Sequence, residues 1–237
     1  MQSIERELLL DIGNTRIKVG VWEEGRVKLL KTFETAKVLK EPKEFRELLK
    51  GSGSVAVACV VPEIERIIRE SSKECFFVEK GLSRLPIDLK DYSGNLGADR
   101  IANMAGAAEL FNSFITVSCG TATVIDVVVD KKFIGGVILP GLRLMAESLA
   151  ERTSLLPSVK NFKRLELGLD TSSSIEGGVL FATVGAVREV KREWKGLPLV
   201  ITGGSGRVIS ELVGGIYISE LTLRGIWRIW RGRGLPR

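Results

Sequence analysis

Two short turns in this chain combine glycine with hydroxyl-bearing side chains, a composition suited to binding phosphate. The first turn, residues 11–15, follows the apolar residues 8–10, and the second, residues 118–123, follows the apolar residues 114–117. Backbone amides exposed in such turns, and the hydroxyls beside them, donate hydrogen bonds to phosphate oxygens. The alternative is a pair of ordinary β-turns, because glycine and asparagine are common in turns of any function. The candidate phosphate ligands are Asp11, Gly13, Asn14, Thr15 and Lys18 in the first turn, and Gly120, Thr121 and Thr123 in the second.

A carboxylate, Asp11, stands at the point where the first apolar segment ends. A charged acid at the end of a buried strand is costly unless a cation or hydrogen-bond donors satisfy it. We therefore expect Asp11 to hold Mg²⁺ beside bound phosphates, directly or through water, because Mg²⁺ commonly uses one or two carboxylates together with phosphate oxygens.

A second carboxylate, Asp99, is the candidate general base. It follows the small residues Gly97 and Ala98, which leave room for a substrate, and it precedes Arg100, which can bind a substrate carboxylate through two hydrogen bonds. The helical spacing of the apolar residues 101–108 places Asp99 at the start of a helix. The alternative role is an N-cap aspartate, which requires no function.

The chain contains no histidine and three widely spaced cysteines, Cys59, Cys75 and Cys119. The absence of histidine excludes Ser-His and Cys-His mechanisms, so any general base must be Asp, Glu, Lys or Tyr. Neither a zinc site nor a disulfide framework has the residues that it needs.

The composition is that of an ordinary globular protein, with 44% hydrophobic and 27% charged residues in 237. The longest apolar run, residues 55–61, is too short to span a bilayer, and the N-terminus lacks a signal core, so we expect a cytoplasmic protein with no membrane partner. The net charge is +6, but the basic residues are interleaved with acidic residues through most of the chain, which argues against a nucleic-acid partner. The exception is the Arg- and Trp-rich segment 224–237, which we interpret as an amphipathic helix with a basic tail; nucleic-acid binding is the alternative.

The first turn joins two strands. Ile17, Val19 and Val21 alternate with Lys18 and Gly20, which is the period of a strand. In P-loop and dinucleotide-binding proteins the glycine turn instead opens a helix whose N-terminus holds the phosphate. The chain is therefore predicted to be a two-lobed ATP-using enzyme, with both phosphate hairpins facing one cleft.

Further elements alternate between helix and strand, which predicts an α/β fold. In the first half we expect helices after Pro42 and Pro62, strands at 55–61 and 76–78, and a long functional loop at 81–97. In the second half we expect strands at 114–117, 124–129, 133–139 and 199–202, a helix after Gly141, and a long helix from a capping box of Ser173 and Glu176. An apolar stripe from Val179 to Trp194 on that helix is a candidate dimer surface.

A glycine-rich segment, residues 203–206, joins the last predicted strand to a helix. It begins like a dinucleotide fingerprint, but Ile209 occupies the position of the last glycine, so this match is weak. We nevertheless expect a nucleoside to lie against the backbone of Gly203 and Gly204, because glycine permits close approach.

Five motifs in this order resemble those of type III pantothenate kinase, a family of the acetate and sugar kinase, chaperone ATPase and actin superfamily. The similarity covers nearly the whole chain. It lies in the first turn with Lys18, in Gly97 to Arg100, in the second turn with Asp126, in the segment from Gly135 to Gly141, and in Thr202, Gly203 and Gly204.

The resemblance implies two actin-like (ribonuclease H-like) lobes, each a mixed β-sheet with flanking helices, with a cleft between them. We expect an N-terminal lobe at 1–112 and a C-terminal lobe at 113–237, whose last helix can pack back on the first lobe. It also implies ATP-dependent phosphorylation of pantothenate, the first step of coenzyme A biosynthesis, by a homodimer that uses Mg²⁺ and a monovalent cation, K⁺ or NH₄⁺. A non-catalytic regulatory protein that keeps the nucleotide-binding fold is the alternative.

The resemblance also assigns roles to individual residues. Asp99 would be the base, Asp126 would help to bind the monovalent cation, and Thr171 would reach into the partner subunit's site. The pantothenate-binding residues would be Tyr92, Gly97, Ala98, Arg100 and Thr171. Two positions depart from the family pattern, which usually has an acid in place of Ser118 and a threonine in place of Val124. We therefore expect a weakened or altered dependence on K⁺.

Overall fold

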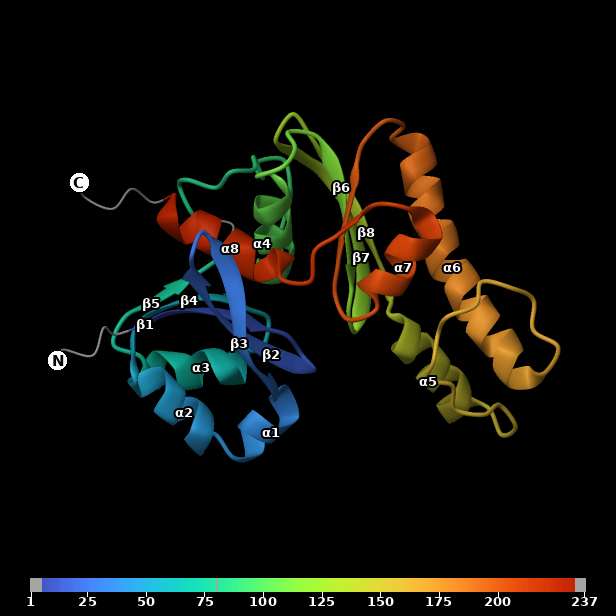
Figure 1. Cartoon of the computed structure of the whole chain (residues 1–237), viewed down its shortest axis with the longest axis horizontal. Helices are drawn as coiled ribbons and strands as arrows, with labels where there is room; N and C mark the ends of the chain where they lie inside the picture. The colour runs from blue at the N-terminus through green and yellow to red at the C-terminus, as the bar shows by residue number, and fades with distance from the viewer. Residues whose placement is uncertain (1–5, 80, 233–237) are drawn as a thin grey trace. The chain divides into compact units, whose positions relative to one another are not determined.

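The chain forms two five-stranded mixed sheets, each flanked by helices (Figure 1). The computed structural model describes residues 6–79 and 81–232. It divides into two compact units, the first formed by Met1–Leu110 with Glu220–Arg237 and the second by Phe111–Ser219. The last helix therefore belongs to the first unit, although the second unit separates it from the rest in sequence.

The sheet of the first unit has the strand order β3-β2-β1-β4-β5. Its strands are β1 (Arg6–Ile12), β2 (Arg16–Glu23), β3 (Arg26–Glu34), β4 (Ser52–Cys59) and β5 (Cys75–Phe77). The first three strands pair antiparallel, whereas β4 and β5 extend the sheet in parallel from β1. The first predicted hairpin is thus a true strand-turn-strand unit, with Ile12 opposite Ile17 at the turn.

Helices cover both faces of this sheet (Figure 1). They are α1 (Thr35–Lys40), α2 (Lys43–Lys50), α3 (Pro62–Ser71), α4 (Ala98–Ala107) and α8 (Leu221–Arg231). One face forms a core with α1 to α3, in which Leu8, Leu10 and Val57 are buried against Phe45 and Ile64. Because side chains alternate along a strand, Leu9 and Asp11 lie on the opposite face, which α4 and α8 contact.

The second unit repeats this plan, with the strand order β10-β9-β6-β7-β8. Its elements are β6 (Phe114–Cys119), β7 (Ala122–Val129), β8 (Lys132–Pro140), α5 (Leu142–Arg152), α6 (Thr171–Glu193), β9 (Leu199–Thr202), α7 (Gly206–Val213) and β10 (Ile216–Tyr217). Strands β6 to β8 are antiparallel, and β9 and β10 continue in parallel from β6. Alternate residues such as Val117, Ile125 and Ile201 pack against α5, α6 and α7. The strand order and strand directions are therefore the same in the two units.

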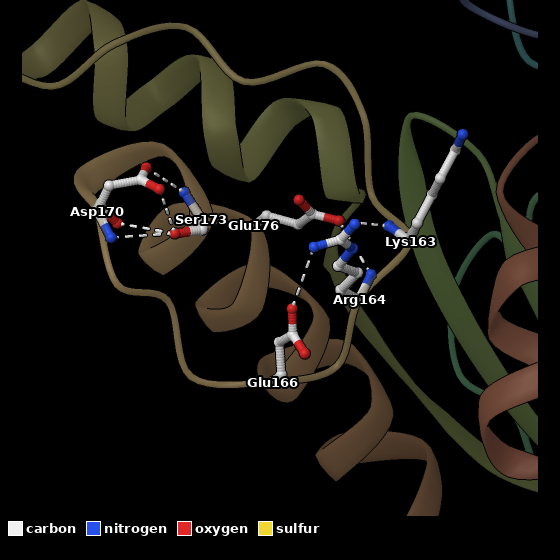
Figure 2. A network of polar contacts seen from close by, with 6 residues as sticks. All are labelled: Lys163, Arg164, Glu166, Asp170, Ser173 and Glu176. Atoms are coloured by element: carbon white, nitrogen blue, oxygen red, sulfur yellow. Dashed lines mark hydrogen bonds and ion pairs between the residues drawn. The ribbon is translucent and has the colours of Figure 1, made fainter.

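The long helix α6 begins differently from the prediction (Figure 2). Its N-cap is Asp170, whose carboxylate accepts a hydrogen bond from the Ser173 amide at 3.0 Å, and the Ser173 hydroxyl accepts one from the Asp170 amide at 3.2 Å. Glu176 instead accepts hydrogen bonds from the amides of Lys163 and Arg164, at 2.6 and 2.9 Å. The prediction of a Ser173–Glu176 capping box is wrong, because Glu176 holds the preceding loop onto the helix.

The apolar stripe of α6 faces the core of its own unit. Val179 and Val187 are buried there, and Val190 and Trp194 pack against the same cluster. The prediction that this stripe is a dimer surface is therefore wrong, since those side chains are already covered within the chain.

The Trp-rich last helix is packed onto the first sheet. The rings of Trp22 on β2 and Trp227 on α8 stack with centroids 4.9 Å apart, and the Arg231 guanidinium lies 4.3 Å from the Trp227 ring centroid. Arg231 also forms an ion pair with Glu7. Residues 233–237 of the basic segment lie outside the described residues. Within the described ranges, the structure contains no helix that is long and apolar enough to cross a membrane.

Candidate functional site

The loop between β1 and β2 is a tight hairpin turn. The Gly13 amide donates to the Arg16 carbonyl at 3.0 Å, and the hydroxyl of Thr35, the first residue of α1, donates to the Gly13 carbonyl at 2.7 Å. Asn14 and Thr15, at the tip, are exposed. The tip of the loop is therefore exposed on a backbone that is held from both sides.

Asp11 sits one residue pair before this turn, in register with Lys18 across the β1–β2 ladder. Burial raises the pKa of the Asp11 carboxyl to about 6, and the nearby Asp99 carboxylate adds to the increase. The charge of Lys18 and a hydrogen bond from the Thr222 side chain act in the opposite direction on this pKa. Two acids from distant parts of the sequence therefore lie close enough to repel each other, which favours a cation at this position.

Asp99 lies in the first turn of α4, but it is not the N-cap. The N-cap is Gly97, and no side chain caps this helix. Burial raises the pKa of Asp99, while the Arg100 amide and the Arg100 charge oppose that shift. A Cβ atom on Gly97 would lie 2.6 Å from Asp99 Oδ1, so the carboxylate folds over the glycine. The small residues before Asp99 thus make space for its own carboxylate, and the N-cap alternative is wrong.

Arg100 and Tyr92 come together beside Asp99. The Arg100 side chain is buried, with 8% of the residue exposed, and its guanidinium lies 5.8 Å from the Tyr92 ring centroid. Tyr92 belongs to the long segment between β5 and α4. A cation over an aromatic face is held in a defined orientation, so the Tyr92 ring helps to orient the guanidinium of Arg100, the residue that follows the candidate base.

In the second unit, the β6–β7 loop is held between two other segments. The Gly120 amide donates to the Ala122 carbonyl at 2.9 Å, which closes the turn. From the end of β8, the Gly141 amide donates to the Thr121 carbonyl at 2.8 Å. From the segment after β9, the Ser205 amide donates to the Cys119 carbonyl at 3.1 Å. Three of the predicted motifs are therefore neighbours in space.

The backbone at position 203 requires a glycine. Its φ is +94°, and a Cβ atom there would overlap the backbone of Cys119. Gly204 differs, since a Cβ atom on it would have no neighbour within 4 Å. Gly203 brings the candidate adenosine segment against the β6–β7 loop, and Gly204 leaves open space beside it.

A polar row lies on the face of the second sheet that points away from α5, α6 and α7. Thr116 is in register with Asp126, and Ser118 is in register with Thr202. Asp126 is only 2% exposed, and within the described ranges the buried Thr202 hydroxyl has no hydrogen-bond partner. Ser118 is also the direct partner of Val124. The two departures from the family pattern therefore lie opposite each other in one cross-strand pair.

Two further predicted ligands lie elsewhere in the second unit. Thr123 is fully buried on the helix-covered face of the sheet, and in the described part of the chain its hydroxyl has no partner. Thr171 is the exposed first residue of α6. Neither side chain lies at the tip of the β6–β7 loop, where Gly120 and Thr121 are exposed.

Asn103 and Thr222 form a buried polar pair that the sequence did not indicate. The Thr222 hydroxyl, on α8, donates to Asn103 Oδ1 on α4 at 2.8 Å. Asn103 is a polar residue on an otherwise buried helix, one turn after Asp99. Only the tertiary packing of α8 brings Thr222 beside it.

Solved structures share this fold. A protein assigned to the Baf family of transcriptional activators, from Campylobacter jejuni, has a TM-score of 0.68 at 20% identity, covering 95% of this chain and 98% of its own. The ethanolamine utilization protein EutJ from Carboxydothermus hydrogenoformans has a TM-score of 0.57 at 14% identity, covering 97% of this chain and 91% of its own. At these identities the likeness shows the fold alone.

Sequence relatives are more specific. A model of the type III pantothenate kinase family matches residues 7–193. The type III pantothenate kinase of Bacillus cytotoxicus is 33% identical over 94% of this chain and 94% of its own. That of Thermosipho melanesiensis is 31% identical over 93% of this chain and 96% of its own. The matched region contains the β1–β2 and β6–β7 hairpins and the Asp99–Arg100 pair, and the chain belongs to the type III pantothenate kinase family.

Proposed function

We propose that this protein transfers the γ-phosphoryl group of ATP to the hydroxyl of pantothenate, producing 4'-phosphopantothenate for coenzyme A biosynthesis. The observation that carries the proposal is the family match over residues 7–193, together with relatives named type III pantothenate kinase that align over nearly their whole length. These names favour a kinase over a non-catalytic regulatory protein. The neighbour named as a transcriptional activator supports only the fold.

Asp99 is the proposed general base. Phosphoryl transfer asks the protein mainly for alignment and charge neutralisation, so a carboxylate within reach of the attacking hydroxyl suffices. The raised pKa of Asp99, caused by burial, makes it a better proton acceptor than an exposed aspartate. The proton of the pantothenate hydroxyl would pass to Asp99 as the oxygen attacks the γ-phosphorus.

Arg100 is the proposed partner of the pantothenate carboxylate. A buried guanidinium held over the Tyr92 ring presents its donors in a fixed orientation, which suits a planar carboxylate. Gly97 and Ala98 would contribute backbone and space beside the base. Binding the carboxylate end of pantothenate would thereby orient the distant hydroxyl toward Asp99.

The phosphates of ATP are the proposed ligands of both hairpin loops. Asp11, Gly13, Asn14, Thr15 and Lys18 would serve them in the first unit, and Gly120, Thr121 and Thr123 in the second. The adenosine would lie against Gly203 and Gly204, since Gly203 holds this segment against the β6–β7 loop.

Magnesium fits the first site. The carboxylates of Asp11 and Asp99 make the local potential more negative. A divalent cation beside Asp11 would relieve its repulsion with Asp99. Asp11 would hold the ion directly or through water, and the bound ion would neutralise charge on the phosphates. The described residues contain no cluster of three or more acids, cysteines or histidines, and Mg²⁺ bound to a nucleotide needs none.

A monovalent cation, K⁺ or NH₄⁺, fits the polar row of the second sheet. Asp126 supplies a buried carboxylate, and the Thr202 hydroxyl supplies an oxygen that lacks a partner within residues 6–79 and 81–232. Ser118, between them along the row, would contribute only a neutral oxygen.

A homodimer is proposed from the surface of the second unit. Leu155, Leu167 and Leu169 are 91%, 86% and 102% exposed, and the last two lie four and two residues before Thr171. Leucines this exposed favour a covering partner, and a second copy of the chain would bring Thr171 to the other subunit's pantothenate site.

The proposal places the enzyme in the cytoplasm, where ATP is available, with no role for nucleic acid or membrane. Trp227 and Arg231, the residues that suggested nucleic acid, pack on Trp22 and Glu7 within the first unit.

A coupled assay of ADP release tests the function. We expect release to require both pantothenate and Mg²⁺, with the product identified by mass spectrometry as pantothenate plus one phosphate. ADP release that is unchanged by pantothenate, or a product without added phosphate, would contradict the assignment.

A further inference from the structure

We propose that Tyr217 is a positioning residue for the nucleoside of ATP: its ring and hydroxyl hold the glycine-rich segment, residues 203–206, in the conformation that leaves Gly204 open to the nucleoside. The inference rests on the proposed function, because it concerns the same nucleotide site. It gives a role to β10, a strand of only two residues that ends at Tyr217.

The hydroxyl of Tyr217 contacts the first residue of the segment. It donates to the Gly203 carbonyl at 3.3 Å, and the Gly206 amide donates to the same carbonyl at 3.1 Å. The first bond is long for a hydroxyl donor, but the tyrosine is partly buried, so water competes less for the carbonyl. The peptide after Gly203 is therefore held both from within the segment and from β10.

The ring of Tyr217 fills the space beside Gly206, the last residue of the segment. A Cβ atom on Gly206 would lie 3.0 Å from Tyr217 Cε2 and 3.3 Å from Tyr217 Cδ2, which is tighter than ordinary van der Waals contact. The Arg207 guanidinium lies 5.2 Å from the centroid of the same ring. These contacts fix the ring, which keeps its hydroxyl at the Gly203 carbonyl.

The turn between α7 and β10 sets where the tyrosine lies. Gly214 and Gly215 have φ values of +73° and +135°, and a Cβ atom on Gly215 would lie 2.9 Å from Leu199 Cβ. The chain therefore turns tightly against β9. Tyr217 then pairs with Ile201 of β9, and the amide of the next residue, 218, donates to the Ile201 carbonyl at 2.8 Å. Because β9 also leads directly into Gly203, one strand positions both the tyrosine and the segment that it contacts.

Gly204 marks the part of the segment that is open to a ligand. It is exposed, and a Cβ atom on it would have no neighbour within 4 Å. The residues around it are fixed, since the Ser205 amide donates to the Cys119 carbonyl at 3.1 Å and Tyr217 contacts Gly203 and Gly206. A backbone held on both sides of an open glycine is organised before the ligand arrives, which lowers the entropy cost of binding.

Packing alone does not account for the hydroxyl. Phenylalanine would fill the space beside Gly206 equally well, and the Gly203 carbonyl already accepts a hydrogen bond from the Gly206 amide. A single neutral hydrogen bond also adds little to the net stability of a fold. The contribution of the hydroxyl is therefore to the orientation of the peptide after Gly203, against which the nucleoside would lie.

The test compares Tyr217→Phe, which removes only the hydroxyl, with Tyr217→Leu, which also removes the ring. We expect Tyr217→Phe to raise the KM for Mg·ATP about 3- to 10-fold, the scale of one lost neutral hydrogen bond. Tyr217→Leu should raise it at least about tenfold, because the space beside Gly206 is then also unfilled. The KM for pantothenate should stay within about twofold in Tyr217→Phe, since its proposed ligands Tyr92 and Arg100 belong to the first unit.

Thr183→Val is the matched control for removing a hydroxyl from the second unit. Thr183 is fully buried on α6, and its hydroxyl has no partner in the described ranges, so its removal should leave both KM values unchanged. Thermal unfolding and circular dichroism of every variant identify those that fold. If Tyr217→Leu does not fold, Tyr217→Phe decides the question, because it keeps the ring and the packing beside Gly206.

Calorimetric binding of magnesium tripolyphosphate, which has no nucleoside, supplies a readout that a general packing defect would not separate. Tyr217→Phe should weaken the binding of Mg·ATP by the same factor as the KM rises, and should leave the binding of tripolyphosphate within about twofold of the wild type. The difference between the two ligands reports the nucleoside alone.

Two results would overturn the inference. One is a wild-type KM for Mg·ATP in folded Tyr217→Phe, and the other is an equal weakening of Mg·ATP and tripolyphosphate, which would indicate a general disturbance of the second unit. Binding measured without pantothenate separates this inference from the proposed function. A wild type that binds Mg·ATP but does not phosphorylate pantothenate contradicts only the function, and equal binding of Mg·ATP by wild type and Tyr217→Phe contradicts only the inference.

Discussion

Asp11 and Lys18 are cross-strand partners, one residue pair before the first hairpin turn. This register places an acid and a base side by side on the face of the sheet that α4 and α8 contact. The acid suits a metal ion, the base suits a phosphate, and the turn between them supplies amides. In the proposed nucleotide site, the Asp11–Lys18 pair would let a hairpin take the place of the helix N-terminus that P-loop proteins use.

Asp11 should oppose folding at neutral pH. Its folded-state pKa of about 6 lies above the ordinary value of 3.8, so its ionised form destabilises the folded state above pH 6, and the penalty disappears as the pH falls from 6 toward 4. We expect Asp11→Asn to raise the free energy of unfolding by about 1 to 3 kcal/mol at pH 7.5, and by almost nothing at pH 4. Denaturant unfolding at both pH values, without nucleotide, measures this. A gain that is independent of pH would contradict it.

Asp99→Asn should lower kcat at least about a hundredfold, the scale of general-base catalysis. The amide keeps the shape of the side chain but cannot accept the proton. The KM for Mg·ATP should change little, and the melting temperature should not fall, because burial disfavours the carboxylate that the mutation removes. Turnover near the wild-type rate would rule out Asp99 as the base.

The α4–α8 crossing should be intolerant of a single methyl group. Gly225→Ala forces a Cβ atom into the Ala102 carbonyl, and we expect a loss of about 1 to 3 kcal/mol or more in the free energy of unfolding. Gly178→Ala, in α6, is the control: a Cβ atom there meets nothing within 4 Å, and alanine should stabilise the helix by up to about 1 kcal/mol. Thermal melts of the two variants should shift in opposite directions; similar shifts would show that the crossing is not tight.

Gly203 and Gly204 should also respond differently to alanine. Gly203→Ala combines a φ of +94° with a clash against Cys119, so it should destabilise the second unit and weaken nucleotide binding. Gly204→Ala has room for its methyl group and should retain stability, with any loss confined to the KM for ATP. Unfolding curves and nucleotide titrations distinguish the two. Equal stability of the variants would refute the role given to Gly203.

The dependence of turnover on K⁺ should be shallow. Ser118 and Val124 face each other where the family pattern has an acid and a threonine, so the polar row lacks one charge and one oxygen. Ser118→Asp should therefore steepen the response of rate to K⁺ concentration. Rates measured from zero to saturating KCl, at constant ionic strength, test this; a steep response in the wild type would contradict it.

Much of the fold could be predicted from local pattern. Both hairpins and helix α3 follow from period-two and helical spacing, since one face of each element is buried. Strand β3 was not predicted, because it is an edge strand with mostly exposed side chains and carries no alternation. Helix α1 is only six residues long and offers too short a period to detect.

The site was predictable only in part. Asp11, Asp99 and the glycine turns are marked by residue types at short spacing. The links between them are tertiary. Thr222 hydrogen-bonds to Asn103 across a sequence separation of 119 residues. Asp99 affects the pKa of Asp11 only because α4 packs on the first sheet. Spacing along the chain contains no information about such contacts.

The second unit lies in sequence between α8 and the rest of the first unit. The first unit is therefore begun first during synthesis but completed last. A ribosome releases residues 111–219 before residues 221–231, so the second unit has all its strands while the first still lacks the helix that covers Ala102 and Gly20. Until α8 is synthesised, the first unit exposes the apolar surface that this helix later covers. A chaperone would bind the chain during this interval.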